Sequence, residues 1–266
     1  MKLITQEDFR NHLIIGEDVY VCGLGVVQYT VEDIIKNYQE FNYMRHFVYF
    51  NKDSLSEKIR PQIDERMFDI KEALMMEYQF NNYDLEYDTF DMIGYVHEVN
   101  ELFVQFLNYF TYHTINKVYH QPIMDMLIVQ YDDNKILEID RKIFGEIIDR
   151  FSILNYATSV SDNKDTIKQT DRAKDFDEKA RKIKQDFDIK EKPDMTFNSI
   201  LSWIVNSVNG YTHDNIKSKT IYMIMDTYMR KNHTAYCDMM NRARSNGICN
   251  LKENELKKIN YALNLY

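Results

Sequence analysis

Two runs of apolar residues at helical spacing constrain the C-terminal part of this chain more than any other feature. Pro193 precedes the first run and Asn209-Gly210 ends it, whereas Ser245-Asn246-Gly247 ends the second. Thr212 has the chemistry to cap a single turn between them. The pattern predicts two packed helices, the first with the stripe Phe197, Ile200, Leu201, Ile204 and Val208, the second with Ile221, Ile224, Met225 and Tyr228, continuing through Tyr236, Met239, Met240 and Ala243.

Glycine and proline are scarce, with 7 and 3 in 266 residues, which favours long helices over a loop-rich β-sandwich. The length allows one large domain or two. A net charge of −9 leaves no basic surplus for a nucleic-acid backbone. The three cysteines have no paired spacing, and no apolar run approaches the ~20 residues that span a bilayer. We therefore expect a cytosolic protein that binds neither nucleic acid nor membrane.

The N-terminal part combines short strands with helices. A helix is predicted from Gln6 to Ile14, followed by two strands, 18–22 and 26–29, about a glycine turn. Gly23-x-Gly25 lacks the third glycine of a dinucleotide loop, and a strand follows where a helix would begin. Thr30 and Asp33 form a variant of the capping box that opens a helix reaching Phe41.

Further caps mark the next helices. Ser54-x-x-Glu57 is a capping box, and Pro61 is expected to kink or restart the helix that it opens. Residues 89–112 form the most apolar helical pattern, which we expect to be the central helix of an N-terminal domain. Strands 126–131 and 135–139 read as a β-hairpin, and Asp140 caps a helix through Leu154. The fold class is thus α+β and predominantly helical.

Residues of the types used in catalysis do not form a recognisable centre. His97-Glu98-x-x-Glu101 has a glutamate where a zinc protease needs its second histidine, so an exposed helix face explains the trio better. His113 and His120 flank a predicted loop without a third ligand nearby. The acidic residues Asp88, Asp91, Asp132 and Asp133 occupy helix starts and a turn, where carboxylates are common. We therefore expect no enzyme, metal site or cofactor.

The segment 161–192 is dense in charge, and its few apolar residues follow a coiled-coil spacing: Ala173, Phe176, Ala180, Ile183 and Phe187. Such a narrow seam predicts either a connecting helix lying on its own domain or a helix that pairs with a partner or a second copy of the chain. Three parts are therefore expected: an N-terminal α+β domain (1–160), the charged connecting helix (161–192) and a C-terminal helical domain (193–266).

Two motifs far apart in the chain carry a resemblance to a known family. The first is Gly25–Asp33 (GVVQYTVED), a short β element followed by a Thr-Val-Glu-Glu-like helix start. The second is Thr220–Arg230 (TIYMIMDTYMR), which follows the tyrosine-containing turn 210–212. Both resemble segments of the tail assembly chaperones of phages that infect low-GC Gram-positive bacteria. The chain departs from the pattern at Ile216–Lys219. Those proteins often have a hydrophobic residue and a tryptophan at this place. The resemblance covers most of the chain in layout.

The resemblance implies binding without turnover. The expected partner is the tape-measure protein, which is long, helical and partly apolar, and other tail-tube or baseplate proteins are further partners. The C-terminal helices and the charged seam would offer grooves for its helices, with Phe176, Ile183, Phe187, Trp203, Tyr211, Tyr222 and Tyr228 as candidate anchors. The last four are equally explained as core residues. The alternative function is a structural protein of the virion tail, neck or baseplate. The location would be the host cytoplasm during assembly, or the virion.

Overall fold

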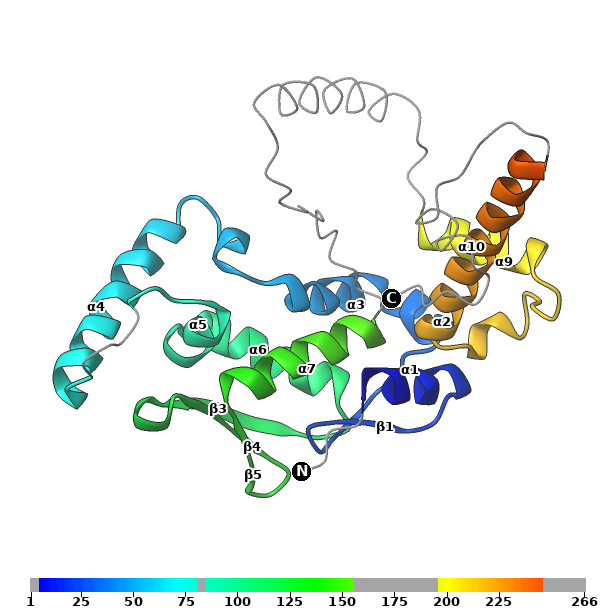
Figure 1. Ribbon diagram of the computed structural model, residues 1–266. Coiled ribbons are helices and arrows are strands. Elements are labelled where there is room, and N and C mark those ends of the chain that lie inside the picture. Colours follow the sequence, from blue (N-terminus) through cyan, green and yellow to red (C-terminus); the bar gives the residue numbers. More distant parts are fainter. Residues whose placement is uncertain (1–4, 81–84, 156–195, 246–266) are drawn as a thin grey trace, which may run out of the picture. The chain divides into compact units, whose positions relative to one another are not determined.

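A computed structural model describes residues 5–80, 85–155 and 196–245 (Figure 1). It contains two compact units, Met1–Ala157 with Lys217–Asp226, and Thr158–Ile216 with Thr227–Tyr266. Helices dominate, and the described strands form two small antiparallel sheets, so the predicted α+β fold class is confirmed. The segment 161–192 lies outside the described residues. The division into three parts therefore stays a prediction.

The first unit opens with the predicted helix and hairpin, but the second strand covers Leu24–Val26 and not the predicted 26–29. Helix α1 (Gln6–Ile15) is capped by Thr5, whose Oγ1 accepts a hydrogen bond from the Asp8 amide. Strands β1 (Val19–Val21) and β2 (Leu24–Val26) pair as a hairpin. The turn residues between them, Cys22 and Gly23, have φ values of 52° and 89°. Two consecutive positive φ angles suit the right-handed twist of a tight hairpin.

Two helix predictions in the next segment need correction. The helix from Thr30 is interrupted at Asn37 (φ −128°), giving α2 (Val31–Lys36) and α3 (Tyr38–Arg45). Ser54 does not open a helix, because Asn51 accepts hydrogen bonds from the Asp53 and Ser54 amides and caps a short 3-10 turn. The two 3-10 turns here are η1 (His46–Tyr49) and η2 (Lys52–Ser54), and α4 (Arg60–Tyr78) begins with proline in its first turn.

The apolar pattern 89–112 forms two helices where one was predicted. Val96 is extended (φ −108°, ψ 112°) and separates α5 (Thr89–Tyr95) from α6 (His97–Phe110). Asn100 donates a side-chain hydrogen bond to the carbonyl of Ile93 at 2.8 Å. The side chain thus satisfies a backbone group that the break leaves without its helical partner.

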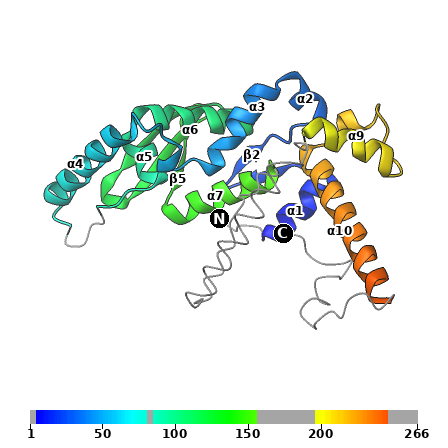
Figure 2. The ribbon, with the colours of Figure 1, turned by 90° about the horizontal axis from the view of Figure 1, so that it is seen from above.

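A three-stranded sheet follows, in the order β3 (Ile115–Gln121), β4 (Met126–Tyr131) and β5 (Lys135–Ile139). The β4–β5 hairpin was predicted, whereas β3 was read as a loop. A 3-10 turn, η3 (Pro122–Met124), joins β3 to β4. Helix α7 (Arg141–Leu154) starts at Asp140, whose Oδ1 accepts a hydrogen bond from the Ile143 amide. Helices α5, α6 and α7 cover one face of the sheet (Figures 1 and 2).

Helix α6 forms the centre of the first unit, as the sequence predicted. Phe106 lies 4.9 Å from Phe47 and 5.0 Å from Phe151, measured between ring centroids, and Phe110 lies 5.2 Å from Phe106. These rings are almost completely buried. Burial of one such side chain stabilises the fold by roughly 1.5–3 kcal/mol, so this aromatic cluster is a principal source of the unit's stability.

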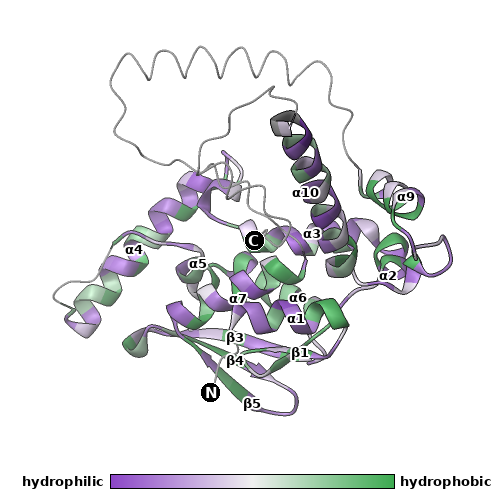
Figure 3. Ribbon diagram, turned by 45° about the vertical axis from the view of Figure 1, so that its right-hand side comes forward, coloured by the Kyte–Doolittle hydropathy of each residue, from purple (hydrophilic) through white to green (hydrophobic). Residues whose placement is uncertain are grey.

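The last two long helices are α9 (Phe197–Ser207) and α10 (Ile221–Ser245), with a 3-10 turn η4 (Ile216–Ser218) between them. Thr196 caps α9 through a hydrogen bond from the Ser199 amide. Thr212 accepts a hydrogen bond from the Asn215 amide, so the cap predicted at Thr212 is confirmed. Hydrophobic and hydrophilic residues alternate along both helices in Figure 3, as expected for amphipathic segments. None of the described helices has the length and apolarity to cross a bilayer.

Candidate functional site

The two segments on which the predicted family resemblance rests, Gly25–Asp33 and Thr220–Arg230, meet at the Thr30–Thr220 pair. Thr30 and Thr220 form an isolated antiparallel β-bridge, although 190 positions separate them in the sequence. The amide of Val31 donates to the carbonyl of Lys219 at 2.9 Å, and the amide of Ile221 donates to the carbonyl of Tyr29 at 3.2 Å. The bridge therefore ties the start of α10 to the segment that follows β2.

Both threonines at this junction also cap helices. Thr30 Oγ1 accepts a hydrogen bond from the Asp33 amide at 3.3 Å, and Asp33 Oδ2 accepts one from the Thr30 amide at 3.1 Å, which completes a capping box for α2. Thr220 Oγ1 accepts a hydrogen bond from the Met223 amide at 3.3 Å. The sequence motifs thus mark two helix starts whose backbones pair directly with each other.

The neighbouring residue Tyr29 anchors the junction in the core. Its hydroxyl donates to the carbonyl of Tyr109 at 2.6 Å, and the two rings stack with centroids 4.9 Å apart. Phe41 and Phe110 present their edges to Tyr29, each at 5.8 Å between centroids. Burial is the main cause that raises the pKa of Tyr29. The hydroxyl therefore stays protonated and acts as a donor.

The candidate anchors predicted from the sequence have different environments. Tyr222 is only 1% exposed and belongs to the core of the first unit. Tyr211 is half-buried, with its hydroxyl 3.1 Å from Thr227 Oγ1. Trp203 is 37% exposed and packs edge-to-face against Tyr228 at 5.4 Å between centroids. Phe176, Ile183 and Phe187 lie outside the described residues. Of the four described candidates, only Trp203 is exposed, whereas Tyr228 is half-buried.

Helix α10 presents more apolar surface than the sequence predicted. Tyr236 and Met239 were placed on its core-facing stripe, but they are 41% and 58% exposed. Met239 lies 18 residues, or five full turns, after the buried Ile221 and therefore on the same face of the helix, so the burial of this face does not continue along all of α10. These two side chains form an exposed apolar face that sequence reasoning missed.

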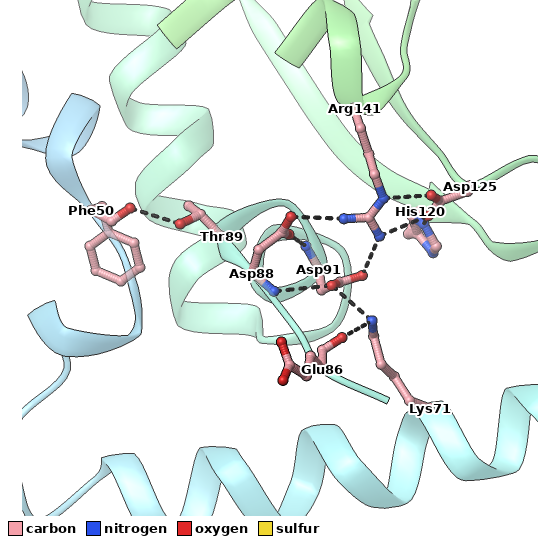
Figure 4. Close-up of polar contacts among 9 residues, drawn as sticks. All are labelled: Phe50, Lys71, Glu86, Asp88, Thr89, Asp91, His120, Asp125 and Arg141. Atoms are coloured by element: carbon pink, nitrogen blue, oxygen red, sulfur yellow. Dashed lines mark hydrogen bonds and ion pairs between the residues drawn. The ribbon is translucent and has the colours of Figure 1, made fainter. Parts of the chain in front are cut away.

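A network of charged residues in the first unit is the described feature that most resembles catalytic chemistry (Figure 4). The Arg141 guanidinium donates through Nη1 to Asp88 at 2.9 Å, through Nη2 to Asp91 at 2.8 Å, and through Nε to Asp125 at 2.6 Å. Its carbon Cζ lies 4.8 Å from the centroid of the Phe90 ring. The flat, five-donor group of arginine suits this multiple recognition of carboxylates.

Asp91 is the buried centre of this network. Its side chain is 1% exposed and lies 3.0 Å from Lys71 Nζ, which also donates to the carbonyl of Glu86. Asp88 and Asp91 form the capping box of α5, since the amide of each bonds the carboxylate of the other at 3.1 Å. The capping role predicted for these two residues is confirmed. Their joint binding of Arg141 was not predicted, because the arginine is some 50 positions further along the chain.

His120 extends the network from β3. Its Nε2 is 3.3 Å from Asp125 Oδ1, while its Nδ1 is buried. Burial lowers the pKa of His120, so the ring is neutral near pH 7. Burial disfavours ionisation of Asp125, but the hydrogen bonds and charge of Arg141 outweigh it and lower the pKa of that carboxyl.

The geometry of the network is that of a structural clamp. Each of its three carboxylates already holds a cationic partner, and the participants come from α4, α5, the β3–β4 connection and α7. Among the described residues, no three His, Cys, Asp or Glu side chains are grouped so that they could hold a metal ion. The exposed pair His97–Glu101, at 3.2 Å, lies one turn apart on α6. Comparison of the chain with protein-family models, curated proteins and solved structures found no match.

Proposed function

We propose that this chain is a non-enzymatic phage tail morphogenesis protein, an assembly chaperone that binds the tape-measure protein through helical surfaces. The observation that carries the proposal is the junction between Gly25–Asp33 and Thr220–Arg230. The two segments that resemble the chaperones are joined by the Thr30–Thr220 bridge. The proposal is supported because both motifs belong to one local structure of this chain.

The proposed activity is the masking of apolar helical surface. A long, partly apolar helical protein aggregates when its apolar stripes are unpaired, and an amphipathic groove or helix face that covers them keeps it soluble. Helices α9 and α10 supply exposed apolar side chains for such contacts, among them Trp203 and Met239. Binding of this kind consumes no substrate and requires no cofactor. It would take place in the host cytoplasm during assembly.

Co-expression with the tape-measure protein of the same phage tests the proposal. We expect the tape-measure protein to be soluble and to co-purify with this chain, and to precipitate when expressed alone. Failure of both effects would contradict chaperoning. Mass spectrometry of purified particles tests the structural alternative, because an assembly factor should be absent from the finished virion, whereas a tail, neck or baseplate component should be present.

A further inference from the structure

The second unit carries an exposed apolar surface on one side of α10. We call it the α10 strip and define it by Tyr228, Met229, Tyr236 and Met239, together with Trp203 of α9. Met229 is 36% exposed, and the higher exposures of Tyr236 and Met239 were given above. The edge-to-face packing of Trp203 on Tyr228 joins the two helices in one surface. All five residues belong to the same unit.

The strip has the dimensions of a helix-binding site. At 100° per residue its four α10 members fall within an arc of about 100°, and the eleven steps from Tyr228 to Met239 span roughly 16 Å. Its composition also suits binding: methionine adapts its shape to a partner, while tyrosine and tryptophan are the residues that most often dominate binding energy. The strip can therefore accommodate three turns of a second helix.

One long edge of the strip carries two basic residues and one acidic residue. Lys231 and Arg242 are exposed and lie beside Tyr228 and Met239 around the helix, on the side away from Met229, and the exposed Asp238 lies next to them. Residues 227–245 contain four basic residues and one acidic residue, whereas the whole chain carries a net charge of −9. The helix segment that carries the strip is thus basic within an otherwise acidic protein. Complementary charge on a partner would fix its direction and register.

We propose that the α10 strip binds an amphipathic helix whose apolar face is bordered by aspartate or glutamate. The inference rests on the proposed function and names the chemistry of the tape-measure segment that the chaperone would hold. Two copies of the chain meeting through this strip would bring together two helix segments that each carry four basic residues and one acidic residue, which is unfavourable. Residues 247–266 hold three lysines and two glutamates, so they are no acidic complement.

The first experiment measures binding of two synthetic peptides to the full chain by fluorescence anisotropy. Both peptides have about 20 residues, enough for a helix longer than the strip, and the same leucine heptads. One carries glutamates beside the leucine face and the other carries lysines there. We expect the glutamate peptide to bind at least about tenfold more tightly, a difference that rising salt reduces.

Variants of the strip locate the binding. Met239→Asn removes an exposed apolar contact and should weaken the glutamate peptide by about tenfold, as for an interfacial hot spot. The double variant K231E/R242E should weaken the glutamate peptide and strengthen the lysine peptide. Its matched control, K58E/K142E, changes the net charge equally at exposed positions of the first unit and should bind as the wild type does. Circular dichroism checks that all variants are folded.

Three outcomes would overturn the inference: equal binding of both peptides, equal binding by wild type and strip variants, or displacement of the glutamate peptide by single-stranded DNA of equal charge. Co-expression separates this failure from failure of the proposed function. If the tape-measure protein co-purifies equally with wild type and strip variants, chaperoning stands and the strip is not its site. If the peptide binds through the strip but the tape-measure protein does not co-purify, the strip binds helices and the chaperone proposal fails.

Discussion

Replacement of Arg141 by methionine should destabilise the first unit strongly. The substitution leaves the buried Asp91 with Lys71 as its remaining cationic partner. Removal of one member of a buried ion pair costs about 3–5 kcal/mol. Because Lys71 still compensates Asp91, we expect about 2–3 kcal/mol here. The contacts of Arg141 with the more exposed Asp88 and Asp125 add little to that figure.

Urea unfolding followed by far-UV circular dichroism measures this loss. With an m value of about 2 kcal/mol/M, the midpoint should fall by roughly 1–1.5 M. The neighbouring exposed Lys142→Met is the matched control and should leave the midpoint unchanged. Trp203, the single tryptophan, belongs to the second unit, so its fluorescence should shift less than the dichroism. Equal midpoints for Arg141→Met and Lys142→Met would refute the view of the network as a clamp.

Three further changes test other parts of the structure. Gly94→Ala would place a Cβ 2.9 Å from the Cβ of His120 and should lower the free energy of unfolding by about 1–3 kcal/mol. Gly145→Ala on α7 would place a Cβ that meets nothing within 4 Å and should raise the free energy of unfolding by about 0.5–1 kcal/mol. Urea titration of both variants measures these changes. Thr30→Ala removes a helix cap and should cost about 1 kcal/mol, seen as a lower melting temperature, while Thr30→Ser restores most of it. The pKa of His120 is lowered in the folded chain, so on acidification the unfolded chain binds the proton first. The free energy of unfolding should therefore fall as the pH drops below about 6.5. In the His120→Gln variant, the free energy of unfolding should depend less on pH between pH 7 and 5.

Local cap and turn chemistry explains the elements that the sequence predicted well. Thr30, Asp140 and Thr196 each bind an amide three residues ahead, an interaction that depends only on neighbouring residues. The β4–β5 hairpin was predictable for the same reason, since two apolar runs flank a short polar turn of three residues with positive φ. Such prediction fails where another nearby residue competes for the same amide. Ser54 was predicted to cap a helix, but its own amide donates a hydrogen bond to the side chain of Asn51, which caps a 3-10 turn instead.

The strand β3 was missed because its alternation is broken. Ile115 and Val118 are both buried although they are three positions apart, and a register shift lies between Ile115 and Lys117. In a regular strand, side chains on the same face are separated by an even number of positions. A bulge lets two residues with an odd separation, such as Ile115 and Val118, face the same side of the sheet. A search for strict alternation therefore passes over the segment. The break at Val96 is equally hidden, because α5 and α6 both bury apolar residues and the overall pattern stays helical.

Contacts between distant segments explain the rest of what sequence reasoning missed, and they bear most directly on function. No local pattern indicates that Thr30 and Thr220 pair, because each is sufficiently explained by the helix that it caps. Once the bridge is present, each cap has a second role, since displacing either threonine would disturb the backbone hydrogen bonds at 2.9 and 3.2 Å beside it. A substitution at Thr30 that moves the backbone should therefore also disturb the start of α10, and a substitution at Thr220 should disturb the start of α2. The junction couples two helix starts that sequence reasoning treats as independent.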